Sequence, residues 1–153
     1  MRITNGAYII DKRGNILITH PTNHVNTLWS IPKGLTDDDE TSKEAAIREV
    51  WEETNLDLEL FINKTIYRDM GSRNYGRKKR LNAHFFYIDL PLSEMDLNLW
   101  CKSRFDCEET GANLPENDIT KWETLKFARE FLHYSQKEIL NKVEILLGSV
   151  DFK

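Results

Sequence analysis

Short apolar runs separated by turn residues predict that the first ninety residues are rich in β-strands. Ala7–Ile10 and Ile16–Thr19 are β-type runs on either side of a polar, glycine-containing turn, which favours a hairpin. Pro32 restricts the short apolar run Trp29–Pro32 to a strand end or a sheet edge. Three later runs complete the expected strands: Glu59–Ile62, Thr65–Arg68 and Ala83–Leu90.

Between these strands, the chain carries the strongest helix signal in the sequence. Thr41 and Glu44 have the S/T-x-x-E spacing of a capping box, and the helical pattern runs to about Thr54. Four residues then fall on one face at about 100° per residue and predict the side that packs on the protein: Ile47, Val50, Trp51 and Thr54.

The carboxyl-terminal third is expected to be helical, whereas the segment before it carries little periodic pattern. Ser93–Leu114 is predicted to be mostly loop, with room for one strand. After Trp122, apolar residues recur at mostly helical spacing and predict one or two packed helices. Strands before and after a helix indicate an α+β sandwich with helices on a mixed sheet. The length of 153 residues fits a single domain, 1–153.

Composition excludes several classes of protein. With 40% apolar residues and 16 aromatic side chains from Trp, Tyr and Phe, intrinsic disorder is disfavoured. A net charge of -4 argues against a generally basic nucleic-acid binder, and no apolar run approaches the roughly 18 residues of a membrane span. Two cysteines are too few for a disulfide scaffold or a four-ligand zinc site. Together with an amino terminus that lacks a signal-peptide pattern, this favours a cytoplasmic protein with reduced thiols.

The predicted helix also carries a group of carboxylates. Glu49, Glu52 and Glu53 are spaced 0, +3 and +4, so they are neighbours on a helix, expected opposite the apolar face. Amphipathic surface helices often have such a glutamate-rich face, but clustered carboxylates repel one another unless a cation lies among them. Because all these donors are hard oxygens, the cation they suit is Mg²⁺ or Mn²⁺.

The longer spacing around this helix is more specific. Gly34, five residues, Glu40, seven residues and then Arg48-Glu49-Val50-Trp51-Glu52-Glu53-Thr54-Asn55-Leu56 resemble the Nudix hydrolase signature, G-x5-E-x7-R-E-U-x-E-E-x-G-U, in which U is apolar. Asn55 is the one departure, because the signature has glycine there. Asparagine tolerates the left-handed conformation that ends such a helix, so the substitution preserves the cap.

The resemblance implies an α/β/α sandwich with the Nudix helix on one side of a mixed sheet and the carboxyl-terminal helices on the other. It also implies cleavage of a diphosphate that joins a nucleoside to a second group. By position, Glu49, Glu52 and Glu53 correspond to metal ligands, with the Gly34 carbonyl as a further oxygen. Arg48 corresponds to a residue that orients a carboxylate, with a plain surface ion pair as the alternative.

The source of the general base is left open, because it varies within the family. Glu53 is expected to be a ligand or the base, and Glu40 to lie in an outer shell or at a second metal. A second option is Glu116, six residues before Trp122, in a stretch that resembles diadenosine polyphosphate hydrolases and bacterial RNA pyrophosphohydrolases. In that pattern the Glu reaches the metal site. The alternative for Glu116 is a solvated loop residue, and Glu108 and Glu109 are weaker candidates.

Residues outside the signature suggest how a substrate is held. Trp29–Gly34 has the form W-x-I-P-K-G of the same two subfamilies, and there Lys33 faces the phosphates. The basic run Arg77–Arg80 could bind a polyphosphate or an RNA 5′ end, or could be a solvated hairpin tip. Tyr75 could stack on a base, with a packed core residue as the alternative. The substrate-binding candidates are therefore Lys33, Tyr75, Arg77, Lys79 and Arg80. The four histidines have no metal spacing, and we assign them no role.

The leading functional hypothesis is a Mg²⁺- or Mn²⁺-dependent pyrophosphohydrolase for a dinucleoside polyphosphate. Alternatives within the same class are an RNA 5′-end pyrophosphohydrolase or decapping enzyme, and a hydrolase of ADP-ribose or NADH. A non-catalytic Nudix-fold nucleotide sensor is the alternative of a different class. The expected partner is a nucleotide-containing small molecule, with an RNA 5′ end as the second option and no membrane. Whether the protein is a monomer or a homodimer is left open.

Overall fold

The structure is a computed structural model that describes residues 2–150. Its main sheet has six strands in the order β4-β5-β1-β2-β8, with β3 paired to β1. The pairing of β1 with β5 is parallel and the other pairings are antiparallel, so the predicted mixed sheet is confirmed. The strands of this sheet are β1 (Arg2–Ile10), β2 (Ile16–Pro21), β3 (Lys33–Leu35), β4 (Thr65–Asn74), β5 (Lys79–Ile88) and β8 (Asn117–Glu123).

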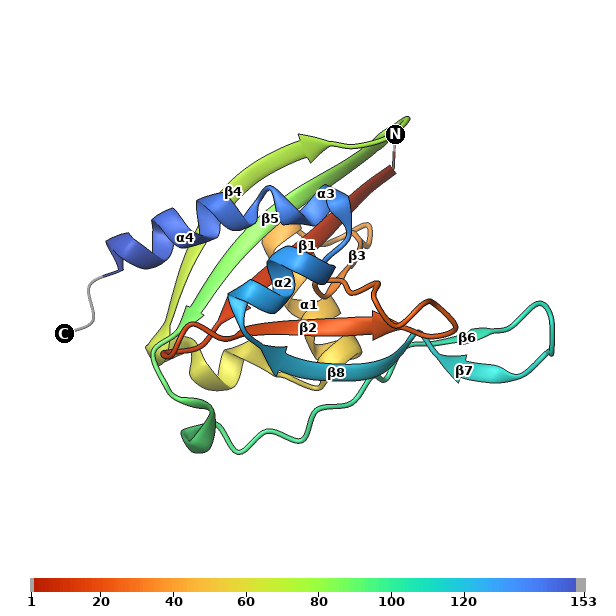
Figure 1. The fold of residues 1–153 in the computed structure, drawn as a ribbon, viewed down its shortest axis with the longest axis horizontal. Coiled ribbons are helices and arrows are strands. Elements are labelled where there is room, and N and C mark those ends of the chain that lie inside the picture. The colour runs from red at the N-terminus through yellow and green to blue at the C-terminus, as the bar shows by residue number, and fades with distance from the viewer. Residues whose placement is uncertain (1, 151–153) are drawn as a thin grey trace.

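Helices cover both faces of the sheet (Figure 1). The α1 helix (Ser42–Thr54) packs on one face, where Ala46 and Val50 join Ala7 and Ile9 of β1 in a buried cluster. On the opposite face, Tyr8 and Ile10 of β1 contact the carboxyl-terminal helices. These are α2 (Leu125–Phe131), α3 (Tyr134–Lys137) and α4 (Leu140–Ser149). The α/β/α architecture implied by the sequence resemblance is therefore confirmed.

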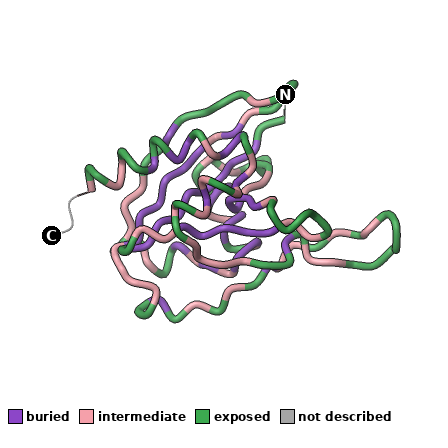
Figure 2. The backbone as a smooth tube through the Cα atoms, in the orientation of Figure 1, coloured by how far each residue is buried: buried purple, intermediate pink, exposed green. Residues whose placement is uncertain are grey.

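The alternation of side chains along β1 explains this layering. Successive residues of a strand point to opposite faces, so the run Ala7–Ile10 supplies both cores at once. Figure 2 shows the buried strands crossing the middle of the molecule between the two helical layers. The turn from β1 to β2 is held by Asp11, whose Oδ1 accepts from the backbone N–H groups of Arg13 and Asn15 at 3.1 and 2.6 Å. Gly14 takes the positive φ of 82° that this turn requires.

Several expected elements differ from the structure. Glu59–Ile62 is not a strand, because it lies within a 3₁₀ helix, Leu58–Lys64, that begins where Asp57 accepts from the Glu59 N–H at 3.0 Å. The strands β4 and β5 extend farther than predicted, so only residues 75–78 form the hairpin tip. The carboxyl-terminal region has three helices in place of one or two, and β8 was not predicted.

The segment 93–114 is mostly irregular, as expected, but it includes a hairpin of two strands. The strands β6 (Arg104–Asp106) and β7 (Asn113–Pro115) pair only with each other and project from the body of the protein (Figure 1). A short 3₁₀ turn, Leu92–Glu94, precedes them. Cys101 and Cys107 are free thiols. Within residues 2–150, none of the helices combines the length and apolar character needed to cross a membrane.

Candidate active site

The candidate site lies where β3, α1 and the start of β8 meet. The predicted capping box at the beginning of α1 is present, with Thr41 and Glu44 each bonded to the other's backbone N–H. At the other end, Asn55 adopts the left-handed conformation with φ of 66°, and its N–H donates to the Trp51 carbonyl at 2.9 Å. The departure of Asn55 from the Nudix signature therefore leaves the helix cap intact.

The orientation of α1 differs from the simple amphipathic prediction. Trp51 is 44% exposed, although we expected it on the packing face, whereas Glu49 and Glu53 are only 8% and 5% exposed. The buried face comprises Ala45, Ala46, Glu49, Val50, Glu53 and Thr54. The helix therefore turns two carboxylates toward the sheet. The predicted packing face is confirmed for Val50 and Thr54, which are buried, and for Ile47, which is partly buried. It was wrong for Trp51 and omitted the two glutamates, because apolar periodicity assumes that charged side chains face water.

Arg48 gathers the carboxylates on the outer side of the helix. Its Nη1 donates to Glu49 Oε1 at 2.9 Å and to Glu52 Oε2 at 3.0 Å. Its Nε and Nη2 donate to the two oxygens of Glu40 at 2.7 and 3.0 Å, and Nη2 also donates to the Leu35 carbonyl at 2.8 Å. This bonding lowers the pKa of Glu40. Arg48 thus joins the loop after β3 to α1, which is more than a plain surface ion pair.

Gly34 lies directly against Glu49. A Cβ atom added at Gly34 would be 2.1 Å from the Glu49 carboxyl carbon and from its Oε1, closer than any side chain allows. The absence of a side chain at Gly34 therefore lets β3 approach the carboxylate this closely, and any larger residue would displace Glu49 from this position. Burial raises the pKa of Glu49 to about 7, although Arg48 opposes that shift.

Glu53 lies deeper than the other carboxylates and is bonded to neutral donors. Its Oε1 accepts from the Lys33 backbone N–H at 3.1 Å, and its Oε2 accepts from Asn117 Nδ2 at 3.2 Å. Among residues 2–150, no Lys, Arg or His side chain forms an ion pair with it. Burial therefore raises its pKa to about 8, with the two hydrogen bonds acting in the opposite direction.

Two adjoining cavities open at these residues. The smaller, of about 350 Å³, is lined by Gly34, Glu49, Glu52 and Glu116 together with Arg48. The larger, of about 400 Å³, is lined by Glu53, Lys33 and Lys79 and by the aromatic residues Trp29, Tyr75, His133 and Tyr134. Both cavities share the same four residues, Arg2, Thr4, Lys33 and Glu116. One continuous hollow therefore has a carboxylate end and an aromatic end.

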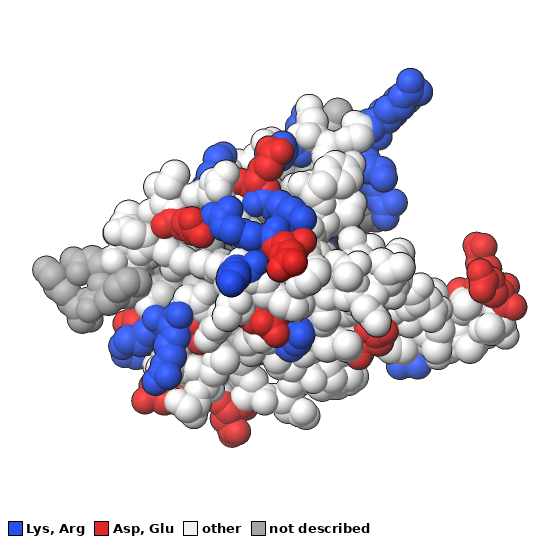
Figure 3. All heavy atoms as spheres, in the orientation of Figure 1, with Lys and Arg blue, Asp and Glu red and all other residues white. Residues whose placement is uncertain are grey.

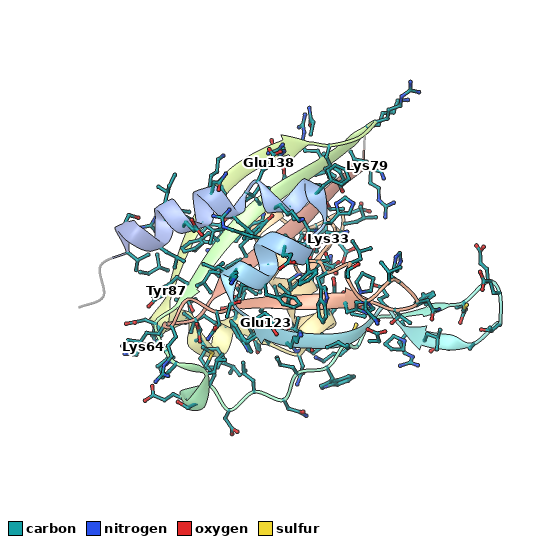
Figure 4. All side chains as sticks on the ribbon, in the orientation of Figure 1. Lys33, Lys64, Lys79, Tyr87, Glu123 and Glu138 are labelled. Atoms are coloured by element: carbon teal, nitrogen blue, oxygen red, sulfur yellow. The ribbon has the colours of Figure 1, made fainter. Side chains whose placement is uncertain are left out.

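The five candidate substrate residues divide into two groups. Lys33, Tyr75 and Lys79 line the larger cavity, and Figure 4 labels Lys33 and Lys79 near the same end of the sheet. Arg77 lies in the hairpin tip and Arg80 bonds Asn74 at 3.0 Å, and neither lines a cavity described here. In Figure 3 basic side chains stand out from the β4–β5 hairpin, away from the body of the protein.

Sequence reasoning missed several residues that line the cavities. Arg2 stands opposite Lys79 in the parallel pairing of β1 with β5, so register brings two cations together that lie far apart in sequence. Asn117 comes directly after Glu116, and its amide could have been noticed beside that candidate. His133 and Tyr134 lie at the beginning of α3, as its N-cap and its first residue, where no local pattern indicates a site.

The donor set suits a hard divalent cation, although the side chains do not now converge on one point. Within the described residues, no three acidic, histidine or cysteine side chains are close enough together to hold a metal ion. Arg48 instead bonds both Glu49 and Glu52. The oxygen donors around the smaller cavity and the close approach of the Gly34 backbone to Glu49 nevertheless fit Mg²⁺ or Mn²⁺.

Comparison with solved structures supports the fold. The chain aligns with an Ap4A hydrolase of C. elegans in a binary complex, with a TM-score of 0.71 and 21% identity over 98% of this chain and 100% of that one. It aligns with the NUDIX domain of Shewanella oneidensis NrtR complexed with ADP ribose, with a TM-score of 0.69 and 12% identity. This alignment covers 96% of this chain and 88% of that one. It also aligns with a bifunctional NMN adenylyltransferase/ADP ribose pyrophosphatase from Francisella tularensis, complexed with AMP and Mn ion. That alignment has a TM-score of 0.64 and 22% identity, and it covers 97% of this chain and 41% of that one.

Comparison by sequence identifies the family. The chain is 40% identical over 50 residues to phosphatase NudJ of Escherichia coli (strain K12), an alignment that covers 33% of each protein. The match thus spans only a third of the length of these curated relatives. The NUDIX domain model, by contrast, matches residues 1–143. The chain therefore belongs to the NUDIX family.

Proposed function

We propose that this protein is a Mg²⁺- or Mn²⁺-dependent pyrophosphohydrolase whose substrate is a dinucleoside polyphosphate. The observation that carries the proposal is the pair of adjoining cavities with Arg2 and Lys33 at their shared border. An aromatic pocket suits a nucleoside, cations suit a phosphate chain, and clustered carboxylates suit a divalent metal. A nucleoside joined to a phosphate chain that binds a divalent metal has these features in the same order.

The metal ligands would be Glu49 and Glu52, with Glu53, Glu116 and the Gly34 carbonyl as further oxygens. When bound, the metal would neutralise phosphoryl oxygens and lower the pKa of a coordinated water. Arg48 Nη1 bonds one oxygen of Glu49 and one of Glu52, so the metal would either take the other oxygen of each carboxylate or displace these bonds. Arg48 would keep its bonds to Glu40 and to the Leu35 carbonyl, so it would continue to hold the loop after β3.

Glu53 is the first candidate for the group that accepts the proton of the attacking water. Its carboxylate lies at the wall of the larger cavity, beside Lys33 and Glu116, and its pKa of about 8 suits proton exchange near neutral pH. Glu116 faces both cavities and is the second candidate. The exposed hairpin residues Glu108 and Glu109 line neither cavity, so we do not propose them.

Lys33, Lys79 and Arg2 would hold the phosphate chain, and Tyr75 would contact the nucleoside. Lys33 contributes to the site in two ways. Its backbone N–H donates to Glu53, and the residue lines both cavities. Arg77 and Arg80 do not line the cavities, so we expect them to contribute little to a small substrate.

The test is product analysis of a substrate panel with Mg²⁺ and with Mn²⁺. The panel holds diadenosine tetraphosphate, ADP-ribose, NADH, nucleoside triphosphates and a 5′-triphosphate RNA. Preferred cleavage of the tetraphosphate to ATP and AMP would support the proposal. Preference for ADP-ribose or NADH would show that the substrate is not a dinucleoside polyphosphate. Nucleotide binding without turnover by folded, metal-bound protein would indicate a sensor.

A second candidate function is removal of pyrophosphate or a cap from RNA 5′ ends. The specific observation in its favour is the exposed basic tip at residues 75–78, adjoining Lys79 of the larger cavity. An RNA entering that cavity by its 5′ end would pass this tip, whereas a dinucleotide would not need it. Selective loss of RNA cleavage in Arg77→Ala, with tetraphosphate cleavage retained, would establish this second activity.

A further inference from the structure

Asn117 contacts the most buried carboxylate of the site, and within residues 2–150 the contact with that carboxylate is the shorter of the two hydrogen bonds of its amide. The residue is 8% exposed, and its Nδ2 donates to Glu53 Oε2 at 3.2 Å; its other polar neighbour is Cys101 Sγ at 3.9 Å. The Lys33 N–H holds the other Glu53 oxygen at 3.1 Å. We propose that Asn117 is a positioning residue that fixes the carboxylate plane of Glu53, an inference that rests on the proposed function.

A β-bulge directs Asn117 to this position. From Ile16 to His20, each residue of β2 pairs regularly with β8, ending at the pair His20 and Ile119. The next pair is Pro21 with Asn117, so Asp118 is an extra residue on β8. Bulges re-aim the side chains that follow them, and they are frequent beside active sites.

Without the bulge, Asn117 would face the wrong side of the sheet. Side chains alternate along a strand, so Asn117 would share the face of Ile119, which is 46% exposed. Ile119 pairs with His20 of β2, and His20 lies on the same face of β2 as Ile18. Ile18 belongs to the core cluster that includes the carboxyl-terminal helices. The extra residue moves Asn117 to the opposite face, where Leu17 packs with α1 and where Glu53 lies.

Contacts from the neighbouring loop hold the bulge. Asp118 Oδ1 is 2.6 Å from His20 Nδ1, and His20 Nε2 is 2.9 Å from the Val25 carbonyl. On the other side of Asn117, the Thr22 N–H donates to the Glu116 carbonyl at 3.0 Å. Asn117 is therefore flanked by the Asp118 side chain, which contacts His20 of β2, and by the Glu116 carbonyl, which is bonded to Thr22 just after β2. These contacts hold the backbone that carries the amide.

The chemistry of the contact explains why an amide stands here. An ionised carboxylate only accepts hydrogen bonds, and the amide nitrogen supplies a donor without adding a charge. A leucine of similar size would leave Glu53 Oε2 without this donor in a buried place. Since Glu53 is a proposed metal ligand or base, its orientation affects both metal affinity and the chemical step.

The experiment uses Asn117→Leu and Asn117→Ala, with Ile119→Thr as the matched control on the same strand and the opposite face. Mn²⁺ affinity is measured by calorimetry on the whole protein, and kcat and KM on the best substrate of the panel. We expect Mn²⁺ affinity and kcat to fall 10–100-fold in both Asn117 variants, with KM within about twofold. The Ile119→Thr control should match the wild type. If Asn117→Leu does not fold, Asn117→Ala carries the test, because it removes atoms and adds none.

A double-mutant cycle shows whether Asn117 acts through Glu53. In a Glu53→Gln background, Asn117→Ala should cause no further loss of Mn²⁺ affinity, because the carboxylate that it positions is already gone. Fully additive losses would overturn the proposal, and so would wild-type Mn²⁺ affinity and kcat in a folded Asn117 variant. A raised KM with an unchanged kcat would instead make Asn117 a substrate contact. If no compound of the panel is cleaved, the proposed function fails, while the Mn²⁺ cycle still decides the role of Asn117.

Discussion

The carboxylates of α1 have two different environments. On the outer side, Glu40, Glu49 and Glu52 share the guanidinium of Arg48, with N–O distances from 2.7 to 3.0 Å. On the inner side, Glu53 has two neutral donors and no ion pair within residues 2–150. On one side of the helix, the carboxylates are therefore bonded directly to a cation. On the other side, Glu53 is bonded to neutral donors, and the charge of Lys33 acts on it without an ion pair.

This difference separates the structural and the chemical demands of the site. A carboxylate bonded to arginine favours its charged form and holds its position, which suits a framework. A buried carboxylate without a cation has a raised pKa and gains most from an incoming metal or proton, which suits chemistry. Glu49 belongs to both groups, because Arg48 bonds it while burial still raises its pKa to about 7.

The largest expected effect is on the inner side. Glu53→Gln keeps the shape but removes the charge, so we expect kcat to fall about 10²–10⁴-fold. The free energy of unfolding should stay equal or rise, because the variant no longer buries an ionisable carboxylate that lacks an ion pair. Glu108→Gln, in the exposed β6–β7 hairpin, is the matched control for kinetics and thermal melting. Wild-type turnover by Glu53→Gln would remove Glu53 from the chemistry.

The next effect tests the place where the outer and inner sides meet. Gly34→Ala puts a methyl group where the Glu49 carboxyl lies, so Glu49 must move. We expect a 10–100-fold loss of Mn²⁺ affinity and of kcat. Gly148→Ala, in α4, has no atom within 4 Å of the added methyl and serves as the control, with unchanged kinetics. Equal behaviour of the two variants would contradict the close packing of β3 on Glu49.

A smaller effect is expected on the outer side. Arg48→Lys keeps the charge but cannot reproduce the forked bonds to Glu40, Glu49 and Glu52, so we expect the free energy of unfolding to drop by about 1–3 kcal/mol. Arg129→Lys is the control, because Arg129 forms a similar but more exposed pair with Glu144. Its change should stay within about 0.5 kcal/mol. Urea unfolding of both variants measures the difference, and equal losses would mean that the Arg48 cluster is no special framework.

The smallest effect is a pH dependence that differs between the two sides. The folded pKa values of Glu53 and Glu49 are raised to about 8 and about 7 from an ordinary 4.5, so the folded state keeps protons that the unfolded chain has lost. Without metal, the free energy of unfolding should therefore fall as pH rises from about 5 to 8. Glu40 has a lowered pKa and acts oppositely, stabilising above pH 4.5 and losing that contribution in more acidic solution.

Denaturant titrations across this pH range, repeated with Mn²⁺, measure the effect. Mn²⁺ should flatten the decline, because it binds the ionised carboxylates of the folded state. Glu53→Gln should flatten it as well, without metal. A free energy of unfolding that rises steadily from pH 5 to 8 would show that the inner carboxylate is not protonated in the fold.

The success of sequence-based prediction varied with how local the cause of each element is. The α1 helix was predicted with its cap at Thr41 and its left-handed end at Asn55, because both signals lie within the helix. The strand β8 was missed, because Asn117–Glu123 reads as polar and becomes a strand only through pairing with β2. The run Glu59–Ile62 was wrongly assigned to a strand. It forms a 3₁₀ helix in which Leu60 and Ile62 are exposed, and no strand within residues 2–150 pairs with it.

The candidate site shows the same division. The signature spacing singled out Gly34, Arg48, Glu49 and Glu52, which the structure brings to one cavity with Glu116. It did not single out Arg2, which reaches the site through the register of β1 with β5, or Asn117, which depends on a bulge. Arg77 and Arg80 were included because a basic run is visible in sequence, whereas its direction is not.

By itself, the sequence determined the family, the layer architecture and the residue types of the site, because helix caps, apolar periodicity and a fixed motif spacing are local properties. Only the tertiary structure decided which carboxylates are buried, which cations face them and which side of β8 Asn117 occupies. Burial, strand register and bulges depend on segments far apart in the chain. The chemical difference between Glu53 and its neighbours on the same helix arises from those distant contacts.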